Sequence, residues 1–304
     1  MLLESPPIPS PQCKSIIFAW QGWQLRVPAE WNATSLGGTF SRGHALLADL
    51  DGPRLGVRWK RIPPDKVTQA YLKEIVRSEA GASSACEVVD LSPDHQAGSP
   101  AFAAARLDSA TPGRDVYAAW FAESGRLIEL VCHAHEREGV LMHQLVPSLR
   151  DTSTLPRQPW CVLDLACTVP TGFELRSHDL CAGDLRLNWV NGRRFISVRQ
   201  LAMAQTVLRQ TPLERLVQQA QRHAQYRRVE SVLPETVVTA DGREIMGQST
   251  LMRRRRRFTW RTDLATQRVT LALHDPDRDR IVVVEADDVA LARDVAATVG
   301  GELR

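Results

Sequence analysis

The sequence predicts an α+β fold with two similar domains, each an antiparallel β-sheet packed against helices. The length of 304 residues is about twice that of a common domain. A segment near the N-terminus, residues 23–60, has a degraded copy that begins at residue 161. Both halves then show the same order of strands, one helix, further strands and a closing helix, which is typical of α+β domains.

The copied segment carries a short motif that sets the domain boundaries. Val27-Pro28 is followed three residues later by Trp31, and Val169-Pro170 is followed at the same spacing by Phe173. The boundaries that we predict are a Pro- and Ser-rich flexible tail over residues 1–15, a first domain over 16–150, a polar linker over 151–159, and a second copy over 160–304 that carries an additional Arg-rich strand.

Local patterns place the elements of the first domain. Apolar residues that alternate with polar ones, as in 24–27 and 54–60, predict half-buried strands. Residues 63–65 open a predicted helix that ends near Gly81, because its apolar residues recur every three or four positions. The turn residues 123–125 predict a hairpin between strands over 116–121 and 126–135. Leucines four residues apart, at 141, 145 and 149, predict a closing helix.

In the second domain, Asn191-Gly192 predicts a tight hairpin turn. Residues 211–214, Thr-Pro-Leu-Glu, have the pattern of a capping box, in which the Thr211 and Glu214 side chains bond to backbone amides of the first helical turn. A helix is therefore predicted to begin there. A strand is expected over 244–252, and a last helix over 288–299 ends at Gly300.

The repeated Val-Pro-x-x-aromatic motif, followed by this order of elements, resembles the superfamily that contains the PsbP photosystem extrinsic proteins and the bacterial DcrB-like proteins. The resemblance covers nearly the whole chain as two copies. Members of that superfamily mostly bind other proteins, as photosystem subunits or as Eag-type chaperones of type VI secretion effectors. The resemblance therefore implies a protein-binding role without catalysis, and it transfers no functional residue because the motif is short.

Charge is distributed unevenly along the chain. Residues 1–155 carry 15 Lys and Arg against 17 Asp and Glu, whereas the remainder carries 23 against 18, so the second domain is basic. The sequence has no apolar run of about 18–20 residues, and its N-terminus has an early Glu4 and four prolines instead of a signal peptide. We therefore expect a cytoplasmic protein with reduced cysteines and no membrane partner.

The Arg-rich stretch of the second domain is the main candidate for partner binding. Five consecutive arginines beside two aromatic residues have the composition that neutralises phosphates and stacks bases. On a strand, alternate arginines point to opposite faces. The candidate partner-binding residues on one face and beside it are Arg253, Arg255, Arg257, Phe258 and Trp260. Three interpretations stay open: a strand paired with nearby aspartates, a site for an acidic protein, and a site for nucleic acid.

The segment Cys132-His133-Ala134-His135 is the densest group of candidate metal ligands. On a strand, His133 and His135 share a face with Glu129, so two imidazoles and a carboxylate would form a three-ligand site with an open position. The alternative is a solvated strand face that carries two histidines. The sequence lacks a phosphate-binding loop, a nucleophile elbow and a zinc-finger spacing, so it predicts no catalytic residue and no cofactor.

Among the eight tryptophans, Trp23, Trp31 and Trp59 lie in apolar alternation, which favours core packing over an aromatic groove. Together these patterns predict a non-catalytic protein-binding, scaffold or chaperone-like protein whose partner is another protein or a peptide. One alternative is a nucleic-acid-associated protein that uses the basic second domain. A further alternative is a metal-dependent enzyme at residues 132–135.

Overall fold

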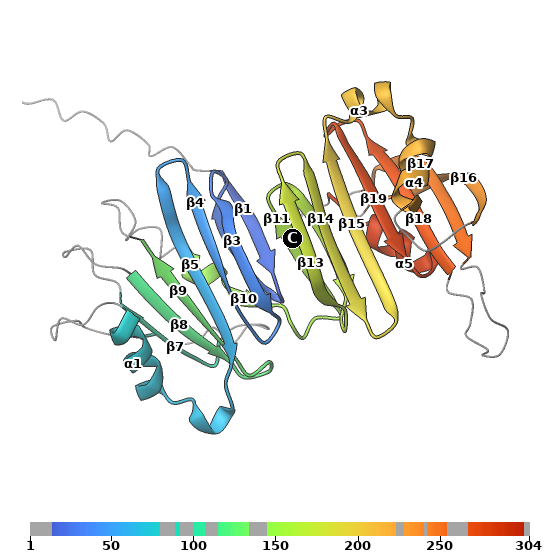
Figure 1. The fold of residues 1–304 in the computed structure, drawn as a ribbon. Helices are drawn as coiled ribbons and strands as arrows, with labels where there is room; N and C mark the ends of the chain where they lie inside the picture. The colour runs from blue at the N-terminus through green and yellow to red at the C-terminus, as the bar shows by residue number, and fades with distance from the viewer. Residues whose placement is uncertain are drawn as a thin grey trace, which may run out of the picture. The chain divides into compact units, whose positions relative to one another are not determined.

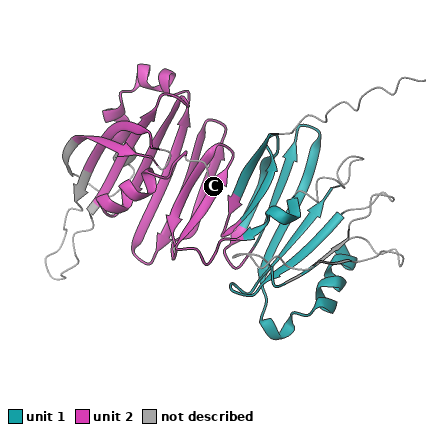
Figure 2. Ribbon diagram, turned by 180° about the vertical axis from the view of Figure 1, so that it is seen from behind, with its two compact units in different colours: residues 1–18, 24–37, 43–150 teal, residues 19–23, 38–42, 151–304 magenta. Residues whose placement is uncertain are grey.

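Figure 1 shows a computed structural model of the chain, which describes residues 14–79, 89–91, 100–106, 115–133, 145–222, 228–239, 242–253 and 267–300. The chain divides into two compact units (Figure 2). Unit 1 comprises residues 1–18, 24–37 and 43–150, and unit 2 comprises residues 19–23, 38–42 and 151–304. No helix in the described residues is both long enough and apolar enough to cross a membrane.

The fold is mainly β, so the predicted α+β fold, with sheets packed against helices, is wrong. The described residues form nineteen strands in three antiparallel sheets and only four short α-helices. Several strands escaped prediction because they are largely exposed and lack apolar alternation, for example β3 (Asn32–Thr39) and β13 (Glu174–Cys181). Apolar residues at helical spacing do form helices, but these helices are short, and strands make up more of the described structure.

One seven-stranded sheet has the order β3-β4-β5-β9-β8-β7-β6. Its other strands are β4 (Arg42–Asp49), β5 (Gly52–Arg61), β6 (Val89–Leu91), β7 (Phe102–Arg106), β8 (Asp115–Phe121) and β9 (Arg126–Cys132). The predicted hairpin is confirmed: β8 and β9 pair directly, and Gly125 in their turn has φ +65°, which favours glycine. The predicted helix after β5 is also present, as the 3-10 turn η1 (Pro64–Lys66) and α1 (Gln69–Glu79).

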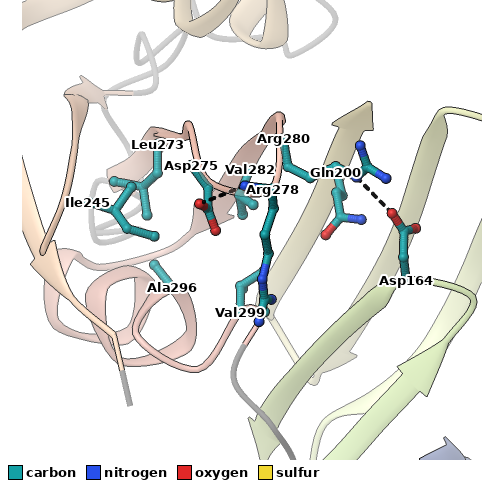
Figure 3. Close-up of a pocket in the computed structure, with 11 residues that line it drawn as sticks. Asp164, Gln200, Ile245, Leu273, Asp275, Arg278, Arg280, Val282, Ala296 and Val299 are labelled. Carbon is teal, nitrogen blue, oxygen red and sulfur yellow. Dashed lines mark hydrogen bonds and ion pairs between the residues drawn. The ribbon is translucent and has the colours of Figure 1, made fainter. Parts of the chain in front are cut away.

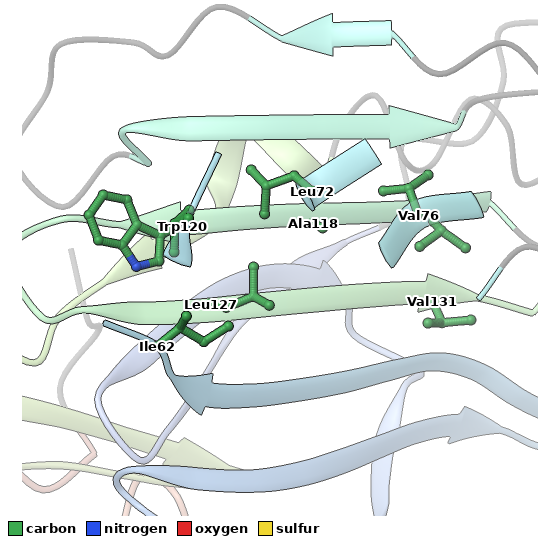
Figure 4. Close-up of a cluster of buried hydrophobic side chains, with 9 residues drawn as sticks. Ile62, Leu72, Val76, Ala118, Trp120, Leu127 and Val131 are labelled. Atoms are coloured by element: carbon green, nitrogen blue, oxygen red, sulfur yellow. The ribbon is translucent and has the colours of Figure 1, made fainter. Parts of the chain in front are cut away.

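The core of this sheet lies under α1 (Figure 4). Leu72 and Val76 of α1 are fully buried against Trp120 of β8 and against Leu127 and Val131 of β9. Every residue of β8 and β9 is buried, so the solvated face that the sequence suggested for β9 is absent. In the predicted closing helix, Leu141 lies outside the described residues, while Leu145 and Leu149 are buried on either side of the 3-10 turn η2 (Val146–Ser148).

The second seven-stranded sheet has the order β13-β14-β15-β19-β18-β17-β16. Its remaining strands are β14 (Asp184–Asn191), β15 (Arg194–Ala202), β16 (Arg228–Val238), β17 (Glu244–Arg253), β18 (Gln267–Asp275) and β19 (Arg280–Ala286). The predicted Asn191-Gly192 turn is confirmed between β14 and β15, with Gly192 at φ +58°. The helices are α3 (Ala204–Gln210) and α4 (Leu213–Arg222) after β15, and α5 (Val289–Ala296) after β19.

The two seven-stranded sheets have the same strand order. In each, three consecutive strands are followed by helical segments and then by four consecutive strands, the last of which pairs with the third. The predicted additional Arg-rich strand of the second copy falls mostly on residues that lie outside the described ones. Its first arginine, Arg253, is the last residue of β17.

The third sheet has five strands in the order β10-β2-β1-β11-β12. They are β1 (Ser15–Trp20), β2 (Trp23–Pro28), β10 (Arg150–Asp151), β11 (Arg157–Val162) and β12 (Leu165–Pro170). The repeated motif adopts the same turn after β2 and after β12. The Trp31 amide donates to the Pro28 carbonyl at 3.1 Å, and the Phe173 amide donates to the Pro170 carbonyl at 3.4 Å. Both turns bury the aromatic ring.

The polar segment 151–159, predicted as a linker, is largely structured and buried. It carries the end of β10 and the start of β11, and Asp151, Thr152 and Ser153 are all buried. The Thr152 amide donates to the Gly22 carbonyl at 2.8 Å, and the Ser153 amide donates to Asp151 Oδ1 at 2.8 Å. Polar residues can be buried here because they bond to backbone groups inside the protein. Their polarity suggested solvent exposure because the sequence does not show these internal partners.

Tryptophan side chains form much of the core. Trp23, Trp31 and Trp59 are buried, which confirms that they pack in the core. In unit 2, the Trp160 ring lies edge-to-face with both Trp20 and Trp189, and each pair of ring centroids is 5.3 Å apart. This edge-to-face geometry is favoured by the quadrupoles of the rings, so the three rings stabilise unit 2 beyond their burial alone.

The start of α4 was predicted correctly, but the capping box does not form. The Glu214 carboxylate accepts a hydrogen bond from Gln248 Nε2. The Thr211 amide donates to the Val207 carbonyl at 2.8 Å and so ends α3, which the sequence did not predict. Among the described residues, the Thr211 hydroxyl has no hydrogen-bond partner.

We therefore expect Thr211→Ala to change the free energy of unfolding by less than about 0.5 kcal/mol, as for a surface substitution. The matched control is Asp288→Ala, because Asp288 Oδ1 accepts from the Leu291 amide at 2.7 Å and caps α5. Loss of that cap is expected to lower stability by about 1 kcal/mol. Urea denaturation of both variants measures the difference, and equal losses would show that Thr211 caps α4 after all.

Candidate binding pocket

Unit 2 contains a cavity of about 330 Å³ between its seven-stranded sheet and α5 (Figure 3). Its apolar wall comes from five side chains: Ile245 of β17, Leu273 of β18, Val282 of β19, and Ala296 and Val299 at the end of α5. The volume falls within the usual range for small-ligand sites. Ala296 contributes only a methyl group, which keeps the cavity open on the helix side.

The register of the sheet brings the strand residues of the pocket together. Gln200 of β15 lies opposite Val282, and Val282 lies opposite Leu273. Residues that lie opposite one another in an antiparallel sheet share a face, so these three form one row under α5. The row continues to Gly247 of β17, opposite Leu273. A Cβ atom at Gly247 would lie 2.7 Å from Leu273 Cδ2, so glycine is required there for the wall to keep its shape.

The two carboxylates of the pocket are held by arginines. Arg243 Nη1 lies 3.1 Å from both oxygens of Asp275, a side chain that is only 4% exposed. Arg280 Nε lies 2.7 Å from Asp164 Oδ2 (Figure 3). The buried Asp275 carboxylate requires such a partner, because transfer of an unpaired charge from water is strongly unfavourable. The Asp164 side chain is 50% exposed, so its ion pair with Arg280 lies at the surface.

Two other polar side chains face the pocket without such partners. Gln200 is 4% exposed, and within the described part of the chain its side-chain amide has no hydrogen-bond partner. Arg278 is exposed at the β18–β19 turn, and among the described residues its guanidinium forms no ion pair. Its Nη1 lies against Gly300, where any side chain would overlap it. Gly300 also has φ +73°, so both space and backbone conformation favour glycine.

Buried thiols in unit 2 have core environments. Burial raises the pKa of Cys161 to about 11, and burial also raises the pKa of Cys167. Both thiols are therefore protonated near neutral pH, and a protonated thiol is a poor nucleophile and a poor metal ligand. The four described cysteines, at positions 132, 161, 167 and 181, are free thiols.

The histidine segment has a different environment from the predicted one. Glu129 is buried on β9, and its Oε1 lies 3.2 Å from Lys60 Nζ of the neighbouring strand. The His133 amide donates to the Arg54 carbonyl at 2.9 Å. His135 lies outside the described residues. Among the described residues, no three His, Cys, Asp or Glu side chains are grouped so that they would hold a metal ion.

Most of the candidate partner-binding residues in the Arg-rich stretch lie outside the described residues. Arg253 ends β17, where its backbone lies opposite Arg228 of β16 and Gln267 of β18. The other four candidates, Arg255, Arg257, Phe258 and Trp260, lie outside the described residues.

Sequence reasoning missed the polar residues of the pocket, Gln200 and Arg278. The local signal for Gln200 was an amide in a strand that also carries Arg194, Ser197 and Arg199. That for Arg278 was a charged residue in the turn between β18 and β19. Neither signal indicates a pocket until strand register and α5 place the two residues together.

A scan against protein-family models gave no match for this chain, and a search of curated proteins gave none either.

Proposed function

We propose that the chain is a non-catalytic protein-binding protein that holds part of its partner in the unit 2 pocket. The observation that carries the proposal is the chemistry of that pocket. Arginines hold both of its carboxylates, so the groups that it presents to a ligand are apolar surface, one guanidinium and one amide. Such groups bind and orient a ligand.

Two further features support a protein as the partner. Each half of the chain resembles PsbP and DcrB-like proteins, which mostly bind other proteins. In addition, a cavity of about 330 Å³ has room for one or two side chains, whereas a stable protein interface buries about 800 Å² on each partner. We therefore expect the pocket to hold one anchoring residue of a larger contact, as a hot spot does.

The proposal is tested by capturing partners with the full chain as bait, with and without nuclease treatment, and identifying them by mass spectrometry. A parallel bait carries Ala296→Phe, which fills the pocket. The expected result is a protein that survives nuclease treatment, binds the purified chain directly in calorimetry, and is lost with the filled bait.

Material that is captured only through nucleic acid, and is lost after nuclease treatment, would contradict the proposal and favour nucleic-acid association through the basic second domain. A purified protein that binds both baits equally would show that the pocket is not its site. Because Ala296 is buried, the melting temperature of the filled bait is measured first, and Val299→Phe serves as the second filled variant.

A further inference from the structure

The pocket is lined by one side-chain amide that forms no hydrogen bond within the described residues. Gln200 comes from the middle of the sheet, and its amide offers two N–H donors and a carbonyl acceptor. Within the described part of the chain no hydrogen bond occupies this amide, so it is available to a ligand in the pocket.

A second polar group at the pocket is cationic. The guanidinium of Arg278 lies at the edge beside Gly300, while the other two arginines of this region, Arg243 and Arg280, are engaged by Asp275 and Asp164. Arginine binds carboxylates through two parallel N–H donors, which gives such pairs both strength and direction. The guanidinium of Arg278 is therefore a positive group that a ligand can reach at this edge, beside the exposed Asp277 carboxylate of the same turn.

The same pocket has an apolar wall of Ile245, Leu273, Val282 and Val299 (Figure 3). A branched aliphatic side chain would match this wall, and Ala296 leaves the space that it needs. The pocket thus combines an apolar chamber, an amide that can bond to a peptide group, and a guanidinium for a negative charge.

We propose that the pocket binds the C-terminus of a partner polypeptide that ends in an aliphatic residue. The last side chain fills the apolar chamber, Arg278 binds the terminal carboxylate, and Gln200 bonds to the last peptide group. This inference rests on the proposed function and specifies the part of the partner that the pocket recognises. Gln200 and Arg278 are then the residues that determine specificity.

The test measures fluorescence anisotropy of the full chain with a dye-labelled Gly-Gly-Ala-Leu peptide that has a free carboxylate. The same peptide with a C-terminal amide lacks the charge and keeps everything else. We expect the amide to bind at least about tenfold more weakly, the ratio that corresponds to about 1.4 kcal/mol. Unlabelled 4-methylpentanoate has the aliphatic group and the carboxylate without the peptide group, and it is expected to compete at least about tenfold more weakly than the unlabelled peptide acid.

Variants assign these effects to residues. Arg278→Met is expected to weaken binding of the peptide acid by about tenfold or more, because only the acid contacts the guanidinium. The weaker binding of the peptide amide is expected to stay unchanged. Gln200→Leu is expected to weaken the binding of both peptides by a similar factor. The matched control is Arg193→Met, an exposed arginine in the β14–β15 turn that does not line the pocket, and it is expected to change neither affinity. Arg278 is exposed, so its variant tests the site without disturbing the core.

Four results would overturn the inference. Equal binding of the acid and the amide would remove the role of the carboxylate. Unchanged acid binding in Arg278→Met would place that carboxylate elsewhere. Competition by 4-methylpentanoate as tight as that of the peptide would make the pocket a site for a small carboxylic acid. A partner protein that binds wild-type bait, is lost from the filled baits and binds Arg278→Met normally would overturn this inference alone and leave the proposed function in place.

Discussion

Replacement of Trp160 by alanine is expected to lower the free energy of unfolding by about 3–5 kcal/mol, the range for loss of a large buried aromatic side chain. Trp160 is 1% exposed and lies at the centre of the contacts with Trp20 and Trp189. Among the described residues, the indole N–H groups of these three rings have no hydrogen-bond partner. Their stabilisation is therefore due to apolar burial and edge-to-face contact, and alanine removes both.

Urea denaturation followed by circular dichroism measures this loss. Trp160→Phe is the graded control, because it keeps an aromatic ring between Trp20 and Trp189 and should lose less stability than alanine. Leu50→Ala is the exposed control, since Leu50 at the β4–β5 turn is fully exposed and its removal should have little effect. A Trp160→Ala protein as stable as the Leu50→Ala protein would contradict the described core of unit 2.

Gly247→Ala is expected to destabilise unit 2 by about 1–3 kcal/mol, the range for overpacking a well-packed site. A methyl group at this position would approach Leu273 Cδ2 to 2.7 Å and would overlap the Ala272 carbonyl oxygen, which belongs to the backbone of β18. Backbone cannot move aside as a flexible side chain does. The substitution should therefore loosen the pairing of β17 with β18 and distort the pocket wall.

The matched control for Gly247 is another glycine inside a strand, Gly56 of β5. A methyl group there would find its nearest neighbours at 3.7 Å, which is ordinary van der Waals contact. Gly56→Ala should be neutral, or stabilising by up to about 1 kcal/mol, because alanine restricts the unfolded chain. Hydrogen exchange of β17 and β18 amides, together with urea midpoints, compares the two variants. Equal stability of both proteins would refute the tight contact at Gly247.

Turns were the most predictable part of the fold. Gly125 and Asn191-Gly192 form hairpins as expected, because the left-handed backbone conformation that such turns require is set by local chemistry. The turn that follows each copy of the Val-Pro motif also has a local cause. Its backbone hydrogen bond spans only three residues in each copy, and the aromatic residue that follows is buried both times.

Polarity within buried strands was the main source of error. Glu129 suggested a wet face for β9, yet Glu129 is buried and pairs with the partly exposed Lys60 of the neighbouring strand. Asp151 suggested an exposed linker, yet its carboxylate accepts from the Ser153 amide in a buried turn. The partner of Glu129 comes from another strand, whereas that of Asp151 lies two residues along the chain in a turn that tertiary packing buries. Neither the distant partner nor the burial of the turn follows from the periodicity of the sequence.

The pocket could not be predicted for the same reason. Gln200 and Leu273 are separated by 73 residues in sequence, and Val282 of β19 places them in one row only once the register of the sheet is known. Arg278 has no local feature that distinguishes it from the other arginines of this chain. Its position beside Gly300 depends on how α5 ends, and α5 follows the turn by ten residues or more.

Methyl-detected NMR of the full chain, titrated with the Gly-Gly-Ala-Leu peptide acid, tests the unit 2 pocket most directly. The methyl signals of Ile245, Leu273, Val282 and Val299 are expected to shift together with one saturation curve. Those of Leu72 and Val76, which are buried under α1 in unit 1, are expected to stay unchanged. Binding of the peptide with no shift at the four pocket methyls, or with shifts confined to other residues, would contradict the assignment of the pocket as the binding site.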